Sequence, residues 1–268
     1  MFKKNFFATY IFFLLTAQVL AADNGMDFNV QVKPDRSGIS VNWGSKTVYG
    51  NSLNQIEGSG KIVEKERGVS AYSKVRVLGP MDVKLNSSHT ERVKVSADDN
   101  IEPLIETRLE GDTLVIDIKK NSSFTTRNKV VVQVDFKKLD GLALAGSGDV
   151  YINRIVGEKC SASISGSGDI KIAEMDVAQF MGSVSGSGDL RASGKATLQT
   201  WSIAGSGDVW GEKLNGQAIK VSIAGSGDAR VGQAENLDVT IAGSGDVTYS
   251  GKPTIKKLIV GSGSVSAR

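Results

Sequence analysis

The chain has very few of the residues that carry most catalytic and metal chemistry. Its 268 residues include one cysteine, Cys160, and one histidine, His89. One cysteine cannot form an intramolecular disulfide, and the alternating stretch 160–164 predicts a packed thiol rather than a nucleophile. A single histidine makes neither a zinc site nor a cysteine–histidine pair, and the polar residues 86–90 around it predict a surface turn. We therefore expect no catalytic residue, no cofactor-binding residue and no metal ligand.

The chain also lacks an excess of charge of either sign. Lysine and arginine total 32 and aspartate and glutamate total 29, which is a formal net charge of +3. Lys3 and Lys4 belong to the leader described below, and without them the net charge falls to about +1. No block of like charge is large enough for a nucleic-acid surface, so we expect no nucleic-acid partner.

A long apolar run occurs near the N-terminus. Two lysines precede the apolar segment 6–15, and the small residues Ala21 and Ala22 offer a cleavage point. This pattern is typical of a secretory signal peptide, which we predict to span residues 1–22. The run is shorter than the roughly 20 residues that span a bilayer, and Asp23 closes it. We expect an exported protein, periplasmic, cell-surface or extracellular, with no membrane span in the mature chain.

Glycine, in contrast, is abundant, and much of it stands in one repeated word. Gly-Ser-Gly-Asp recurs at steps of 18 to 20 residues, and the series ends in Gly-Ser-Gly-Ser. The first glycines of these copies are Gly146, Gly166, Gly186, Gly205, Gly225, Gly243 and Gly261. Flexible linkers have no apolar pattern between their glycines, so this spacing indicates a repeat architecture.

An apolar alternation accompanies each copy. The positions two before the first glycine are Leu144, Ile164, Val184, Ile203, Ile223, Ile241 and Ile259. The positions after the fourth residue are Val150, Ile170, Leu190, Val209, Ala229, Val247 and Val265. Because alternate residues of a strand face one side, each repeat is predicted to be a strand, a tight turn and a second strand.

Two architectures fit one such turn per repeat. A meander or barrel would pair neighbouring hairpins antiparallel, whereas in a parallel β-helix each repeat is one coil and equivalent residues stack about 4.8 Å apart. Near-identical words at identical register favour the second architecture, because one choice of side chain then serves every coil. We predict an all-β parallel β-helix, or β-solenoid, with coils of 18 to 20 residues and glycine at each sharp corner.

The rest of the chain is less regular. Residues 141–268 are expected to form the regular coils, and residues 58–140 are interpreted as divergent coils of the same solenoid. Within them, the segment 105–118 has the pattern of a hairpin. Residues 23–57 form an arm with two short alternating pieces, which are either an extra strand pair or poorly ordered.

The start of the repeat region resembles a bacterial family in four short segments: Gly58–Lys61, Glu64–Val69, Val75–Val77 and Met81–Val83. The family is named "putative auto-transporter adhesin, head GIN domain", and the Gly-Ser-Gly-Asp series resembles its body. The resemblance covers residues 58–268. It implies an exported bacterial protein with a right-handed β-helical fold, and the family name implies adhesion. It brings no catalytic residues to this sequence.

The aspartates of the repeated word are the one set of residues whose pattern raises the question of ligand or metal binding. They are Asp149, Asp169, Asp189, Asp208, Asp228 and Asp246. In stacked coils they would form a ladder whose neighbours, about 4.8 Å apart, repel by about 0.9 kcal/mol in water. We expect each carboxylate to accept backbone N–H groups at its own corner. The alternative is calcium between the coils, as in nonapeptide solenoids, which carry such a turn about every nine residues.

Two outward features could meet a partner. A row of small residues comprises Ser163, Ser183, Ser202, Ser222 and Thr240, and it either contacts a partner or simply stacks well. Alternation places Trp201 inside and Trp210 outside, where Trp210 contacts a sugar or protein or packs against Arg191 or Arg230.

These observations favour a non-enzymatic exported β-solenoid that acts as an adhesin, a cell-envelope scaffold or a binding module. The expected partners are a cell-surface polymer, an envelope protein or a second copy of the chain. Two alternatives stay open at this point: a calcium-stabilised binding solenoid, and a carbohydrate-active β-helix enzyme, which would need carboxylates and basic residues grouped in a cleft.

Overall fold

The computed structural model describes residues 30–32, 39–41 and 55–268. The chain divides into two compact units, Met1–Tyr49 and Gly50–Arg268. In the first unit, β1 (Val30–Val32) and β2 (Ile39–Val41) pair antiparallel. These strands fall in the two alternating pieces of the predicted arm, whereas the predicted signal peptide, residues 1–22, lies outside the described residues.

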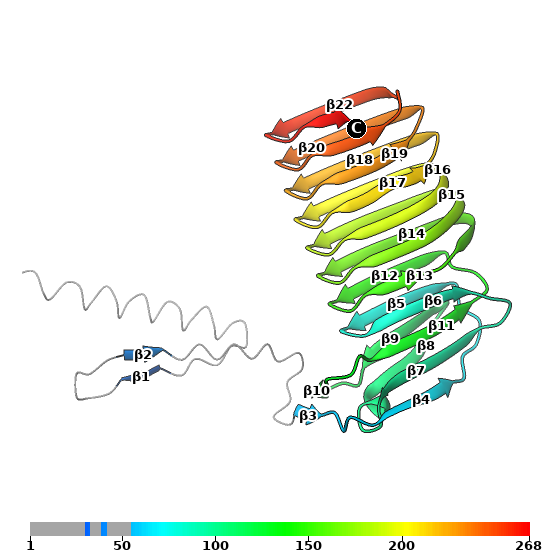
Figure 1. Ribbon diagram of the computed structural model, residues 1–268, viewed down its shortest axis with the longest axis vertical. Helices are drawn as coiled ribbons and strands as arrows, with labels where there is room; N and C mark the ends of the chain where they lie inside the picture. The colour runs from blue at the N-terminus through cyan, green and yellow to red at the C-terminus, as the bar shows by residue number, and fades with distance from the viewer. Residues whose placement is uncertain (1–29, 33–38, 42–54) are drawn as a thin grey trace, which may run out of the picture. The chain divides into compact units, whose positions relative to one another are not determined.

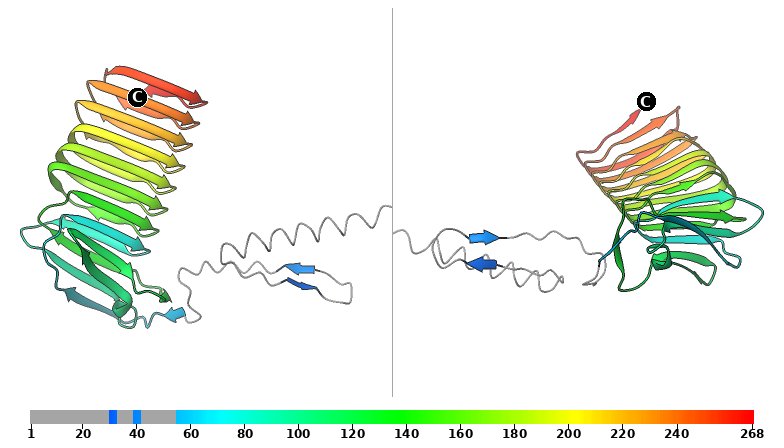
Figure 2. Two further views of the ribbon diagram at one scale, coloured as in Figure 1. Left: turned by 180° about the vertical axis from the view of Figure 1, so that it is seen from behind. Right: turned by 60° about the horizontal axis from the view of Figure 1, so that its bottom comes forward.

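The second unit contains the stacked coils that the repeats predict (Figures 1 and 2). Its regular strands are β12 (Gly141–Gly146), β13 (Val150–Ile152), β14 (Ile155–Gly166), β15 (Ile170–Gly186), β16 (Leu190–Gly205), β17 (Val209–Asn215), β18 (Ala218–Gly225), β19 (Ala229–Gln233), β20 (Asn236–Gly243), β21 (Val247–Ser250), β22 (Thr254–Gly261) and β23 (Val265–Ala267).

Every pairing among these regular strands is parallel, and each glycine corner lies in register with the next. Gly166 pairs with Gly186, and Gly205 pairs with Gly225. The choice of a parallel β-solenoid over an antiparallel meander is therefore confirmed. The physical reason is the register: the same word at the same position lets backbone pairing and side-chain stacking be satisfied together in each coil.

The two apolar rows predicted from the alternation face each other across the corner and form the core. Ile164, Ile203 and Ile223 are buried in the strands before the corner, and Ile170 and Val209 are buried in the strands after it. Burial of each such side chain stabilises the fold by about 1.5–3 kcal/mol. The rows are less buried in the last coil, where Ile259 and Val265 are partly exposed.

The segment before the regular coils contains the remaining strands and one short 3-10 helix. They are β3 (Gln55–Glu57), β4 (Ile62–Arg67), β5 (Lys74–Gly79), β6 (Asp82–Ser87), β7 (Arg92–Asp98), η1 (Glu102–Leu104), β8 (Ile105–Glu110), β9 (Thr113–Ile118), β10 (Ser123–Thr125) and β11 (Val131–Phe136). The first regular coil stacks in parallel on β5 and β6.

Antiparallel pairs occur in this N-terminal segment beside the parallel ones. β4 pairs with β7, β7 with β11, and β8 with β9. The pairing of Leu109 with Leu114 confirms the hairpin predicted for 105–118. Glu102 is fully buried in this segment and forms ion pairs with Lys65 and Arg67 of β4. These two cations compensate the buried charge of its carboxylate.

The C-terminal end of the stack is formed by β22 and β23. Lys257 of β22 stands in register with the buried Val239 of β20, so a charged residue takes an inward position in the last coil. Charges at such positions disfavour the addition of a further strand. Leu258 and Val260, on the outward side, are 61% and 65% exposed.

Candidate functional site

The Gly-Ser-Gly-Asp corner is shaped by the close approach of successive coils. Gly205 has a φ of 130°, which other residues rarely adopt. Gly207 has an ordinary φ, but a Cβ on it would lie 2.1 Å from the carbonyl oxygen of Gly188 in the coil below. The N–H groups of Ser206 and Gly207 both donate to the carbonyl of Gly186. The glycines are therefore explained by the geometry of the corner.

The aspartates do form a ladder, but their hydrogen bonds differ from the expectation. The Oδ1 atom of Asp208 accepts the backbone N–H of Asp228, one coil further on, at 2.8 Å. The donor for each carboxylate is thus the next coil and not its own corner, which corrects the sequence-based prediction. The same bond recurs along the ladder, with N–H to Oδ1 distances of 2.8–3.1 Å, for Asp149, Asp169, Asp189, Asp208, Asp228 and Asp246 as acceptors.

The ladder has one member that the repeated word did not reveal. Asp82 accepts the N–H of Asp149 at 3.1 Å and lies at a corner beginning at Gly79, which pairs with Gly146. The corner reads Gly-Pro-Met-Asp, so only its first and last residues match the word. At the other end, Ser264 donates both its N–H and its hydroxyl to Asp246. A serine there closes the ladder without leaving a further carboxylate unbonded.

The calcium alternative needs several oxygen ligands gathered around one point of the ladder. Among the described residues, no group of three or more histidine, cysteine, aspartate or glutamate side chains could hold a metal ion. The second carboxylate oxygen of Asp189 pairs with Arg191 at 2.8 Å, and that of Asp82 pairs with Lys129 at 2.9 Å. Backbone N–H groups, arginine and lysine thus offset part of the repulsion between neighbouring carboxylates.

The two tryptophans lie as the alternation predicts. Trp201 is fully buried, packs edge-on against Phe180 with ring centroids 5.0 Å apart, and donates its Nε1 hydrogen to Gln199. Trp210 points outward and lies between Arg191 and Arg230, whose guanidinium carbons are 4.6 and 3.9 Å from its ring centroid. The predicted packing of Trp210 against these arginines is confirmed.

The single cysteine and the single histidine lie where the sequence places them. Cys160 is buried, and burial raises the pKa of its thiol to about 12. A thiol with so high a pKa is a poor nucleophile at neutral pH. His89 is exposed in the connection between β6 and β7.

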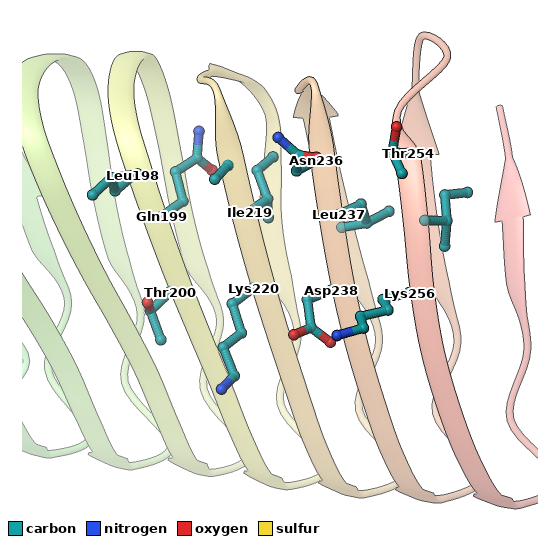
Figure 3. A pocket seen from close by; sticks show the side chains of 12 residues that line it. Leu198, Gln199, Thr200, Ile219, Lys220, Asn236, Leu237, Asp238, Thr254 and Lys256 are labelled. Atoms are coloured by element: carbon teal, nitrogen blue, oxygen red, sulfur yellow. The ribbon is translucent and has the colours of Figure 1, made fainter.

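A groove of about 480 Å³ crosses the outer side of four successive coils, at strands β16, β18, β20 and β22 (Figure 3). One wall is formed by Leu198, Ala218, Asn236 and Thr254, and the other by Thr200, Lys220, Asp238 and Lys256. Neither lysine makes an ion pair within the described part of the chain. Sequence reasoning missed this groove, because its walls are rows of unlike residues that only the coil register brings together.

Within the described residues, no helix has the length and apolar character needed to cross a membrane.

Comparison with solved structures shows the same fold in several bacterial proteins. A putative adhesin from Bacteroides fragilis NCTC 9343 is 24% identical, with a TM-score of 0.74 over 80% of this chain and 100% of that one. A putative lipid binding protein from Parabacteroides distasonis ATCC 8503 is 25% identical, with a TM-score of 0.66 and the same coverage. A putative adhesin from Parabacteroides merdae ATCC 43184 is 20% identical, with a TM-score of 0.65 over 80% of this chain and 99% of that one.

No curated protein matches the sequence of this chain. The model of one protein family does match it, over residues 71–253, which is more than half of the chain and includes the corners from Gly79 to Gly243. The chain therefore belongs to the family described as "Putative auto-transporter adhesin, head GIN domain".

Proposed function

We propose that this protein is an exported, non-enzymatic binding module that acts in adhesion or as a scaffold of the cell envelope. The observation that carries the proposal is the groove across β16, β18, β20 and β22. It spans four coils, or about 14 Å along the stack, and so offers an elongated contact surface. An extended polymer or a partner's extended segment fits such a surface better than a small substrate does.

The chemistry of the groove supports binding. Leu198 and Ile255 provide apolar surface at its two ends, and Lys220, Asp238 and Lys256 stand in successive coils along one wall (Figure 3). Exposed side chains of both kinds are typical of contact surfaces that combine apolar burial with polar specificity. Burial in the core raises the pKa values of Tyr72 and Cys160, and neither residue lines the groove.

Membership of an adhesin family indicates a surface or extracellular location. Export through the signal peptide, and a final position in the periplasm or on the outer surface, are parts of the proposal. Cell fractionation combined with protease shaving of intact cells tests both, because a surface protein is cleaved and a periplasmic one is protected.

The function is tested by measuring the attachment of cells that lack the gene and of the same cells complemented with the wild type or with variants. Ala218→Trp fills the groove, and we expect it to abolish complementation. Ala224→Trp is the matched control, since Ala224 lies on the same strand, β18, outside the groove and exposed. If loss of the protein leaves both attachment and envelope integrity unchanged, the proposed function is wrong. If the two variants behave alike, the groove is not the contact surface.

A further inference from the structure

A second outward row lies on the strands that follow the corner. Lys171, Arg191, Trp210, Arg230 and Thr248 stand in register on β15, β16, β17, β19 and β21. Trp210 is thus covered on one face by Arg191 and on the other by Arg230. The groove lies on the segments just before each corner and this row on the segments just after it, so the row belongs to a different part of the surface even on β16, which carries both.

The two arginines are held differently. Arg191 donates to Asp189 at 2.8 Å, which fixes it beneath the indole. Arg230 has Asp228 at the corresponding position, yet within the described residues its guanidinium makes no hydrogen bond and no ion pair. This guanidinium stacks on Trp210, and stacking alone restrains an arginine side chain weakly. Arg230 can therefore swing away and uncover one face of the indole.

Three unpaired polar atoms belong to the indole itself, to its strand and to the same outward row. Buried side-chain atoms nearly always have a hydrogen-bond partner. Among the described residues, four have none, and one of these, on Glu102, is ion-paired with a lysine. The other three are Trp210 Nε1, Glu212 Oε2 and Thr248 Oγ1. Glu212 is two residues after Trp210 on β17, and Thr248 is two coils beyond Trp210 in the same row.

The spacing of this row suits a sugar ring. Trp210 and Thr248 are two coil steps apart, which is about 9.6 Å along the stack. When Arg230 moves out, the slot between them has an aromatic face on one side and a hydroxyl on the other. Glu212 supplies a hydrogen-bond acceptor, and the Trp210 Nε1–H supplies a donor. Arg191 is paired with Asp189 and Arg230 has left the slot, so the free charge in the slot is the Glu212 carboxylate, which disfavours an anionic ligand. A neutral sugar presents both an apolar C–H face and hydroxyl groups.

We propose that Trp210, Glu212 and Thr248 form a subsite for one ring of a neutral saccharide, with Arg230 as its movable cover. The proposal rests on the binding function above and names a ligand class for it. The sugar stacks on the face of Trp210 that Arg230 vacates, and its hydroxyls bond to the Glu212 carboxylate and the Thr248 hydroxyl.

Calorimetric titration of the purified exported chain with neutral hexasaccharides of glucose, mannose and N-acetylglucosamine tests the subsite. We expect one of them to bind. Trp210→Ala and Glu212→Gln should each weaken binding by about tenfold or more, since each removes at least one main contact. Trp210→Phe keeps the stacking and should fall between. Arg230→Ala should tighten binding by about threefold, because the closed state no longer competes.

Thr248→Val should weaken binding, and Thr240→Val is its matched control, a partly buried outward threonine on β20. Melting curves of each variant show that loss of binding is not loss of folding. The proposal is overturned if no sugar binds the wild type with a dissociation constant below about 10 mM. It is also overturned if binding is insensitive to Trp210→Phe and Glu212→Gln, because the unpaired polar atoms then bind ordered water and not sugar. Sugar binding without any attachment phenotype would contradict the proposed function alone.

Discussion

Replacing Asp208 with asparagine removes one charge from the middle of the aspartate ladder and keeps the oxygen that accepts the Asp228 N–H at 2.8 Å. Asp208 stands between Asp189 and Asp228, each about 4.8 Å away, so the change relieves about 1.8 kcal/mol of repulsion in water. A neutral acceptor makes a hydrogen bond weaker by about 1–1.5 kcal/mol than a charged one. These terms nearly cancel, and we expect the free energy of unfolding of Asp208→Asn to lie within about 1 kcal/mol of the wild type.

Asp208→Ala provides the comparison that isolates the hydrogen bond. It relieves the same repulsion but leaves the Asp228 N–H without its acceptor, so it should be less stable than Asp208→Asn by about 1 kcal/mol. Asp238→Asn is the control, because Asp238 is an exposed carboxylate on β20 outside the ladder. Its effect should stay within about 0.5 kcal/mol.

Urea unfolding monitored by circular dichroism, at low and high salt, measures these differences. Salt shortens the Debye length from about 10 Å at 0.1 M to about 3 Å at 1 M, so it should stabilise the wild type more than Asp208→Asn. A loss of more than about 2 kcal/mol in Asp208→Asn at both salt concentrations would refute the reasoning, because the charge itself would then be stabilising. Calcium that raises the stability of the wild type but not of this variant would show that the ladder binds a cation.

Three further experiments test the fold directly. Gly207→Ala should lower the free energy of unfolding in urea by about 3 kcal/mol, because its Cβ would lie 2.1 Å from the Gly188 oxygen, whereas Gly157→Ala has open space and should be nearly neutral. Trp201→Ala removes a fully buried ring and should cost about 4 kcal/mol in the same assay. Cys160, whose pKa is raised to about 12, should resist thiol reagents at pH 8 until the chain unfolds. The unfolded thiol ionises near its ordinary value of 9.0, so this residue's contribution to stability should fall as the pH rises from 9.0 toward 12.

The regular coils were predictable because every position of the repeat reports the same environment many times. Ile203 and Val209 are buried, and Ser163 faces outward, as a period of two requires. The N-terminal segment was harder to predict, because strands such as β7 and β8 pair antiparallel and occur once each. A single copy gives no repetition from which to infer the pairing.

The candidate sites were predictable only in part. The alternation put Trp210 outside and named both of its arginine neighbours, and the structure confirms that packing. Asp82 was not recognised as part of the ladder, because its corner shares two residues with the repeated word. The groove could not be found either, since Leu198 and Lys256 are far apart in the sequence and meet only through coil register.

The stacking of the coils, the place of each corner and the residues that face the core all follow from the sequence alone, because periodic apolar residues and glycines have few other solutions. The hydrogen-bond partners of the aspartates, in contrast, depend on the three-dimensional packing of the coils. Whether a carboxylate bonds within its own corner or to the next coil depends on how closely two backbones approach, and that distance is set by the stacked glycines such as Gly207 and Gly188. The same packing decides that Arg191 is tethered and Arg230 is not, although both follow an aspartate by two residues.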